Sequence, residues 1–221
     1  RSLKGYFYDP ELRAFFTIQI SLVLICFIVL IQFSWFADAG ITFDQALIQS
    51  VSMSTTAGFT TTDFANWPVF LPIMLIFSSF IGGCAGSTGG GLKVIRVFLL
   101  YLQGKREVDR LIHPKAVYSV KLGERALPDR VVEAVWGFFS AYAMIFVVIM
   151  IGLIATGMDD VTAFSATAAT LNNLGPGLGS VATTYADASD GSKWLLIIAM
   201  LFGRLEVFSL LVLFSPTFWR S

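Results

Sequence analysis

The chain has 221 residues, of which 56% are hydrophobic and only 14% are charged, with fifteen basic and fifteen acidic side chains. A soluble globular domain has about 45–50% apolar and roughly 25% charged residues, so the composition excludes an ordinary soluble domain. Long apolar runs with few charges indicate an integral membrane protein instead. The chain begins at Arg1 without an initiator methionine, so we expect a fragment or a trimmed chain.

Four long apolar stretches are predicted to cross a membrane, because a crossing helix needs about 20 mostly apolar residues. They are residues 14–36, 67–102, 130–156 and 193–215. The second stretch is 36 residues long and contains the sequence GGCAGSTGGGLK from Gly82 onward. We therefore expect the glycine tract to interrupt this span.

Two shorter helical segments lie between the spans. Shortly after Asp38, from Ile41, the chain reads ITFDQALIQSVSMSTTAGFTTTDF, and after Asp160 it reads VTAFSATAATLNNLGPGLGS. Helical segments of about 10–14 residues are too short to cross a bilayer and suit re-entrant helices. Setting Gly58 against Gly175, an offset of 117 residues, brings span, short helix, glycine stretch and span into the same order twice.

The predicted fold is an all-α integral membrane protein with two span–pore helix–filter loop–span repeats, which is half of a four-repeat pore. The second span is broken by the glycine-rich loop. Residues 1–104 are expected to form the first visible repeat, residues 105–129 a basic cytoplasmic connection, and residues 130–221 the second visible repeat.

The glycine stretches after the short helices have two interpretations. One is an ordinary surface loop in which Gly and Thr make turns. The other is a cation filter, because a short helix entering from outside points its C-terminal carbonyls toward the middle of the membrane. Backbone carbonyls in the following segment can then replace the hydration shell of a cation. The sequence TTAGFT has the outline of the TVGYG filter of potassium channels, whereas NLGPGL is a looser match.

Charge distribution predicts the orientation. Lys and Arg cluster in residues 1–13, in residues 93–130 and at Arg220, while the opposite connections are acidic and contain Lys193 as their only basic residue. By the positive-inside rule, both termini and the central connection are cytoplasmic.

Arg204 remains as a lone basic residue inside the last predicted span, about 15 Å from its outer end at 1.5 Å per residue. An Arg at that depth costs about 2.5–3.5 kcal/mol unless it faces protein or water. One interpretation is a structural ion pair, with Glu206 as a candidate, or a clamp on backbone carbonyls. The other places its charge beside a pore, where it raises the barrier for a cation.

The glycine tract also has alternatives. A phosphate-binding loop requires G-x-x-x-x-G-K-[ST], and GSTGGGLKVI lacks the Lys-Ser/Thr pair. Close helix packing through small residues remains open, although three consecutive glycines exceed what packing needs.

Four segments carry a resemblance to a known family: STTAGFTTTDF, GGCAGSTGGGLKVIRV, LNNLGPGLGSV and GRLEVFSLLVLFSPTFWR. They resemble the TrkH-type subunits of the bacterial Trk/Ktr/HKT superfamily of potassium transporters, and the opening RSLKGYFYDP fits as well. Family members fold four repeats around one pore, and this chain resembles the third and fourth. The resemblance implies a potassium-conducting, non-enzymatic pore subunit of the bacterial inner membrane, with potassium as the transported ion and no cofactor.

The resemblance also implies two groups of site residues. Potassium would bind backbone carbonyls of the filter, whose residues are Thr56, Ala57, Gly58, Asn173, Leu174 and Gly175. An intramembrane gate would comprise Gly82, Gly83, Gly86, Gly89, Gly90 and Gly91 together with Arg204. In the family, a serine at the filter glycine of the first repeat accompanies sodium transport. The two glycines present here therefore fit potassium.

Implied partners are an N-terminal half that carries the other two repeats, a second copy forming a homodimer, and cytoplasmic TrkA-like nucleotide-binding regulatory subunits. No nucleic acid is expected. An alternative function is a secondary transporter with broken helices that couples cation flux to a solute. An intramembrane enzyme is disfavoured, because the only histidine, His113, lies in the basic connection, and the sequence shows no Ser–His pair, paired intramembrane Asp or metal-ligand cluster.

Overall fold

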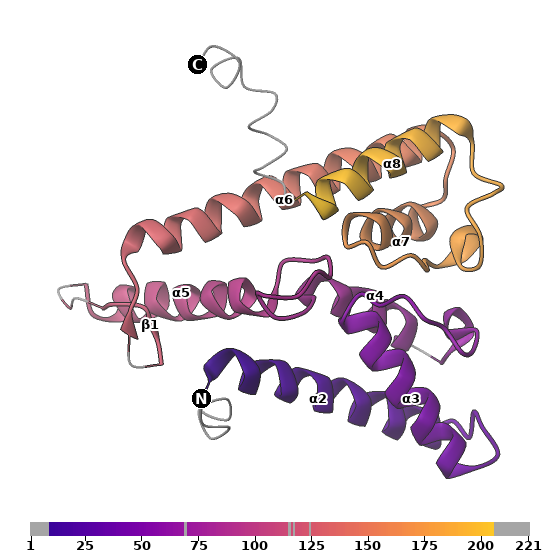
Figure 1. The fold of residues 1–221 in the computed structure, drawn as a ribbon, viewed down its shortest axis with the longest axis horizontal. Coiled ribbons are helices and arrows are strands. Elements are labelled where there is room, and N and C mark those ends of the chain that lie inside the picture. Colours follow the sequence, from indigo (N-terminus) through magenta and orange to yellow (C-terminus); the bar gives the residue numbers. More distant parts are fainter. Residues whose placement is uncertain (1–8, 69, 115, 117, 124, 206–221) are drawn as a thin grey trace.

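A computed structural model describes residues 9–68, 70–114, 116, 118–123 and 125–205 (Figure 1). Several sequence-based predictions concern residues outside these ranges: the basic residues Arg1, Lys4 and Arg220, the proposed pairing with Glu206, and the last span beyond residue 205.

The described chain is mostly helical, as expected. Two helices, α2 (Pro10–Gln32) and α6 (Asp129–Ala155), are long and apolar enough to cross a membrane. Each is followed by a short helix, α3 (Ala39–Ser54) or α7 (Asp160–Leu171), a 3-10 turn, η1 (Phe64–Asn66) or η2 (Gly179–Val181), and a further apolar helix, α4 (Leu71–Ile81) or α8 (Asp190–Arg204). The same order of elements therefore occurs twice.

The central part departs from the expected boundaries. The second predicted span is divided into α4 and α5 (Val94–Ile112), and α5 continues about ten residues past the expected end at residue 102. The sequence GKREVDR accounts for this extension, since Lys, Arg and Glu are good helix formers even where the helix is no longer apolar. A small antiparallel hairpin follows, in which β1 (Lys121–Leu122) pairs with β2 (Arg125–Ala126), so the connection is not purely helical.

Side-chain caps define the starts of both short helices. The Asp38 carboxylate accepts from the N–H of Ile41 at 3.3 Å, and the Asp159 carboxylate accepts from the N–H of Thr162 at 3.1 Å. Each satisfies one of the N–H groups that have no partner within the helix. Both short helices therefore begin at an aspartate and run toward a glycine-containing loop.

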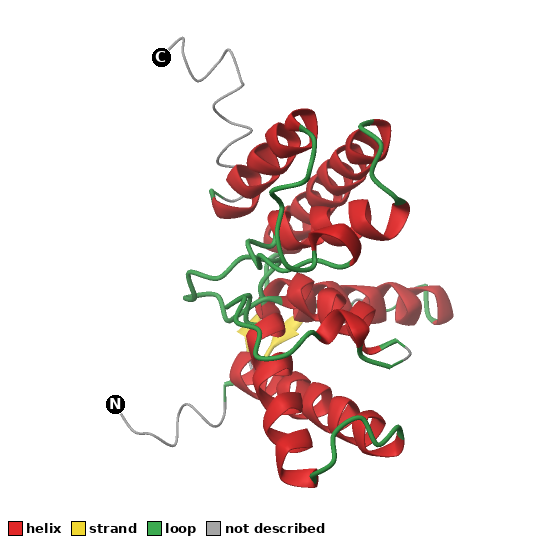
Figure 2. Ribbon diagram, turned by 90° about the vertical axis from the view of Figure 1, so that its right-hand side faces the viewer, coloured by secondary structure: helices red, strands yellow, loops and turns green. Residues whose placement is uncertain are grey.

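Packing between α4 and α7 joins the two groups of helices. The largest buried cluster contains Leu71, Leu75 and Ile76 of α4 together with Ala168 and Ala169 of α7. Figure 1 shows α2 and α3 on one side of α4 and α5, with α6, α7 and α8 on the other. Figure 2, from the side, shows the long loops gathered between these groups.

The long helices keep many apolar side chains exposed. Ile20 and Ile28 of α2 and Met144 and Val148 of α6 are each more than half exposed. Such surfaces favour lipid or further protein as their surroundings, rather than water.

Candidate functional site

The two loops that follow the short helices share an uncommon backbone conformation. In the first loop (residues 55–58), φ is positive at Thr56 and Gly58, at 58° and 77°. In the second loop (residues 172–175), φ is positive at Asn173 and Gly175, at 52° and 105°. Positive φ is uncommon outside glycine, yet it occurs here at two pairs of positions that are each 117 residues apart.

The hydrogen bonds of the two loops match as well. In the first loop, the N–H groups of Ala57 and Gly58 donate to Ser52 O at 2.9 and 3.5 Å. In the second, those of residues 174–175 donate to Ala169 O at 2.7 and 3.4 Å. Both loops therefore fold back under the end of their helix and satisfy carbonyls that have no partner within it.

The two loops approach each other at their glycines. A Cβ atom on Gly58 would overlap the backbone oxygen of Leu174, so only glycine permits this approach. A hollow of ≈ 670 Å³, which we call the threonine hollow, opens on both glycines. Its polar lining includes Thr60, Thr61, Thr62, Thr183 and Asp63.

The segment between α4 and α5, residues 82–93, is the glycine loop, and it lies against the ends of both short helices. The N–H of Gly90 donates to the Thr56 hydroxyl at 3.0 Å. A Cβ atom on Gly90 would overlap the backbone oxygen of Asn172, and one on Gly89 would lie 2.9 Å from the Thr56 hydroxyl. The structure therefore brings residues from both predicted groups, filter and gate, into direct contact.

Other glycines of this loop also have a steric role. Gly82 and Gly91 have positive φ, at 68° and 77°, and a Cβ atom on either would meet backbone oxygens. A Cβ atom on Gly83 would lie 2.8 Å from the Ser87 hydroxyl, whereas one on Gly86 would have nothing within 4 Å. Most of these glycines therefore allow the loop backbone to lie close to its neighbours, and they do not join the faces of two helices. Among the six predicted gate glycines, only Gly86 has no such close neighbour.

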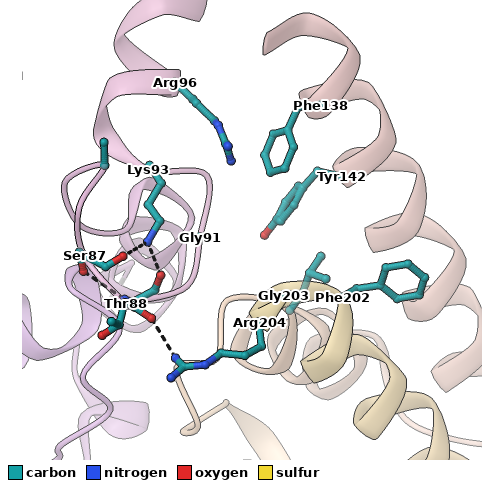
Figure 3. A pocket seen from close by; sticks show the side chains of 13 residues that line it. Ser87, Thr88, Gly91, Lys93, Arg96, Phe138, Tyr142, Phe202, Gly203 and Arg204 are labelled. Carbon is teal, nitrogen blue, oxygen red and sulfur yellow. Dashed lines mark hydrogen bonds between the residues drawn. The ribbon is translucent and has the colours of Figure 1, made fainter. Parts of the chain in front are cut away.

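Charged side chains from α8, from α2 and from the loop itself hold the glycine loop in place. Arg204, the last residue of α8, donates to Thr88 O at 2.8 Å (Figure 3). Lys93 donates from its ammonium to Ser87 O at 2.7 Å and also to Gly89 O. Glu11 of α2 accepts from the N–H of Ala85 at 2.6 Å. The structure ends α8 at Arg204, so the expected helix that continues through this residue is not seen in the part of the chain described.

A second cavity of ≈ 270 Å³, the basic pocket, lies beside the glycine loop (Figure 3). Its charged lining residues are Lys93, Arg96 and Arg204. The Arg96 guanidinium lies over the Phe138 ring, 4.1 Å from its centroid, which is a cation–π geometry. The positive lining makes this pocket unfavourable for a cation.

Several residues of the site were not predicted from the sequence. Asn172 is fully buried. Its side-chain amide donates to the Ser79 hydroxyl at 2.8 Å and accepts from the Tyr142 hydroxyl at 2.5 Å. These two bonds connect α4 and α6 to the second loop. Tyr185 donates to Gly175 O at 2.8 Å. Lys93, two residues after the run of three glycines, has a positive φ of 74°. Of these three residues, only Lys93 has a signal in the sequence that points to the site, namely its position beside the glycine tract.

Among the described residues, no group of three or more His, Cys, Asp or Glu side chains is arranged to hold a metal ion. The oxygen atoms of the two loops are backbone carbonyls, the hydroxyls of Thr55 and Thr56, and the side-chain amide oxygens of Asn172 and Asn173.

Comparison with known proteins identifies close relatives. Residues 1–221 match the TrkH family, described as a cation transport protein. The chain is 66% identical over 218 residues to the Trk system potassium uptake protein TrkH of Vibrio parahaemolyticus, covering 99% of this chain and 45% of that protein. It is 62% identical over 221 residues to TrkH of Escherichia coli, covering 100% of this chain and 46% of that protein.

The solved structures agree with the sequence comparison. The crystal structure of the potassium transporter TrkH from Vibrio parahaemolyticus superposes with a TM-score of 0.93, covering 99% of this chain and 47% of that chain, at 66% identity. The chain therefore spans about half the length of the curated relatives it matches.

Proposed function

Because the chain belongs to the TrkH family of cation transport proteins, we propose that it forms half of a potassium-conducting pore in a Trk-type uptake system. The observation that carries this proposal is the pair of loops at Gly58 and Gly175, which share positive φ positions and hydrogen bonds at one offset. The relatives named as potassium uptake proteins support potassium as the ion. The process is dehydration and passage of an ion, without covalent catalysis.

The two loops act as two sides of a four-sided filter. The C-terminal ends of α3 and α7 carry partial negative charge, which favours a cation beside them. Backbone carbonyls of Thr56, Ala57, Asn173 and Leu174, with the two glycines, replace the hydration shell of the ion. The remaining two sides come from an N-terminal half, on the same polypeptide or on a second fragment.

The glycine loop acts as the gate beneath this filter. It contacts the filter through Gly90 and Thr56, and Arg204 holds it in place through Thr88 O. Two like charges about 7 Å apart, at an effective dielectric constant of about 20, repel each other by about 2 kcal/mol. A repulsion of this size from Arg204 slows a passing potassium ion by roughly tenfold or more.

Replacement of Arg204 by alanine tests the gate. In the full-length transporter, Arg204→Ala removes both the charge and the bond to Thr88 O, so we expect rubidium uptake to rise by about tenfold. Uptake is measured in cells or proteoliposomes without added solute. Uptake that proceeds without a solute also separates a potassium pore from a cation–solute secondary transporter, which the names of the relatives do not favour.

Lys105 supplies the matched control, because it is an exposed basic residue of α5 that lines neither the basic pocket nor the threonine hollow. Lys105→Ala should leave uptake near the parent value. Equal uptake by Arg204→Ala and the parent would exclude the gating role of Arg204.

We also propose a membrane location, an orientation and partner subunits for this pore. The chain crosses the bacterial inner membrane several times, with both termini and the connection 105–129 in the cytoplasm. Its partners are the N-terminal half, a second copy of the subunit, and nucleotide-binding regulatory subunits of the TrkA type. The exposed apolar surfaces of α2 and α6 support the membrane location.

A further inference from the structure

A tyrosine hydroxyl holds the second filter loop. Tyr185 lies between η2 and α8, and its hydroxyl donates to the backbone oxygen of Gly175 at 2.8 Å. The side chain lines the threonine hollow and also an apolar pocket of ≈ 500 Å³ beside α8. Tyr185 is therefore placed between the filter glycine and the helix that follows the loop.

The first loop has a different arrangement. Among the residues that the structure describes, Gly58 O accepts no hydrogen bond. The residue that matches Tyr185 at the offset of 117 is Pro68, which has no hydroxyl. The two glycine carbonyls are thus in similar backbone conformations but in different hydrogen-bonding environments.

The chain that leads to Tyr185 is tied to α7. The Ser165 hydroxyl accepts from the N–H of Leu178 at 2.8 Å and lies 3.2 Å from Leu178 O, to which it donates. The Thr162 hydroxyl accepts from the N–H of Ser180 at 3.2 Å. The segment after Gly175 is therefore held at several points, and the tyrosine reaches the filter from a fixed support.

The bond changes how the Gly175 carbonyl meets an ion. A carbonyl oxygen has two lone pairs, and a hydroxyl that occupies one of them fixes its direction. The bond also reduces the negative potential that the oxygen offers to a second partner. Sodium loses more hydration energy than potassium on entering a filter, so it depends more on strong carbonyl fields.

We propose that Tyr185 is a positioning residue that favours potassium over sodium by holding the Gly175 carbonyl. This inference rests on the proposed function, in which Gly175 belongs to the filter. Removal of the hydroxyl frees that oxygen to turn toward the ion and to offer it a stronger field. Sodium gains more than potassium from this change.

The test is Tyr185→Phe in the full-length transporter. Rubidium uptake is measured with sodium or potassium as competitor. The half-inhibiting concentration of sodium divided by that of potassium gives the selectivity for potassium. We expect this ratio to fall several-fold in Tyr185→Phe, with a smaller change in the maximal rate. Tyr101→Phe is the matched control, because Tyr101 is 67% exposed on α5 and far along the chain from either loop; it should keep the parent ratio.

A second measurement on purified protein follows thermal stabilisation by potassium and by sodium, since ligands that bind the folded state raise its stability. The sodium concentration that gives half the effect should fall in Tyr185→Phe. A parent that shows no selective rubidium uptake contradicts the proposed function itself. A selective parent with an unchanged ratio in Tyr185→Phe overturns the inference about Tyr185 alone. Loss of Tyr185→Phe from the membrane, with Tyr101→Phe retained, would assign Tyr185 a folding role and also overturn it.

Discussion

Steric fit at single glycine residues determines where the glycine loop can lie. Gly90 touches the backbone oxygen of Asn172, while Gly86 faces open space. A backbone oxygen cannot move aside as the end of a flexible side chain can. The same substitution therefore has different consequences at these two positions, although both belong to one short tract.

Gly90→Ala should destabilise the folded protein, whereas Gly86→Ala should not. The added methyl group at residue 90 overlaps Asn172 O, and overpacking of a filled site costs about 1–3 kcal/mol. Thermal unfolding of the purified protein measures this as a lower midpoint for Gly90→Ala only. Equal midpoints for the two variants would show that the loop does not lie against Asn172.

Local patterns in the sequence predict some residues of the candidate site but not others. Gly58 and Gly175 could be predicted because each follows a short helix within a motif. Tyr185 could not, because ATTYADASD is an ordinary polar connection and the bond to Gly175 O depends on how it folds back. The same holds for Asn172, whose two side-chain partners lie 93 and 30 residues earlier in the chain.

At the scale of elements, the short helices depend on their aspartate caps. Hydrogen bonds from the Thr162 side chain and N–H hold the pKa of the Asp159 carboxyl below its usual range. A carboxylate with a lowered folded-state pKa stabilises the protein fully above its ordinary pKa of about 3.9. That contribution is lost as the pH falls through the lower, folded-state value. Because Asp159 is exposed, solvent screening keeps the effect small.

Asp159→Asn separates this charge from the cap itself. Asparagine caps helices about as well as aspartate but does not titrate in this range. The parent should therefore be more stable than Asp159→Asn at neutral pH, and the difference should shrink below about pH 4. Thermal unfolding of both proteins between these pH values measures the difference. A difference that stays constant down to pH 3 would contradict the role of the Asp159 charge.

The helices themselves were largely predictable, because apolar runs and aspartate caps are local signals. Segments 14–36 and 130–156 correspond to α2 and α6 with shifted ends. The extension of α5 was missed because hydrophobicity alone set the expected end, although its helix-forming residues and Pro114 after it are local signals. The small hairpin was not predictable, since it does not differ from the rest of the connection in hydrophobicity or charge. The break between α4 and α5 was signalled by glycine, but its position against the loops 55–58 and 172–175 depends on tertiary packing.

At the scale of the whole molecule, the distribution of charge predicts an orientation in the membrane. Lys and Arg are concentrated in residues 93–130, and the positive-inside rule predicts that this part lies in the cytoplasm. The prediction is tested with single cysteines at two exposed positions, Ser119 in the connection and Asp187 before α8. Cys84 is first replaced by alanine, while Cys26 is buried and remains.

In the full-length transporter in intact cells, a membrane-impermeant thiol reagent should label Asp187→Cys and not Ser119→Cys. In inverted membrane vesicles the pattern should reverse. Labelling of Ser119→Cys from outside the cell would contradict the proposed orientation.

The hydrogen bond from Gly90 to Thr56 has a thermodynamic consequence. It joins the glycine loop to the loop 55–58, so a displacement of one removes an interaction of the other. Two binding or conformational events that share an interaction affect each other equally in both directions. Under the proposed function, ion occupancy of the filter and the position of the glycine loop are therefore linked equilibria: whatever free energy the ion contributes to the closed loop, the closed loop contributes to ion affinity. Under that proposal, the rate of conduction and the ion selectivity both depend on this one coupling free energy and are not independent properties of the protein.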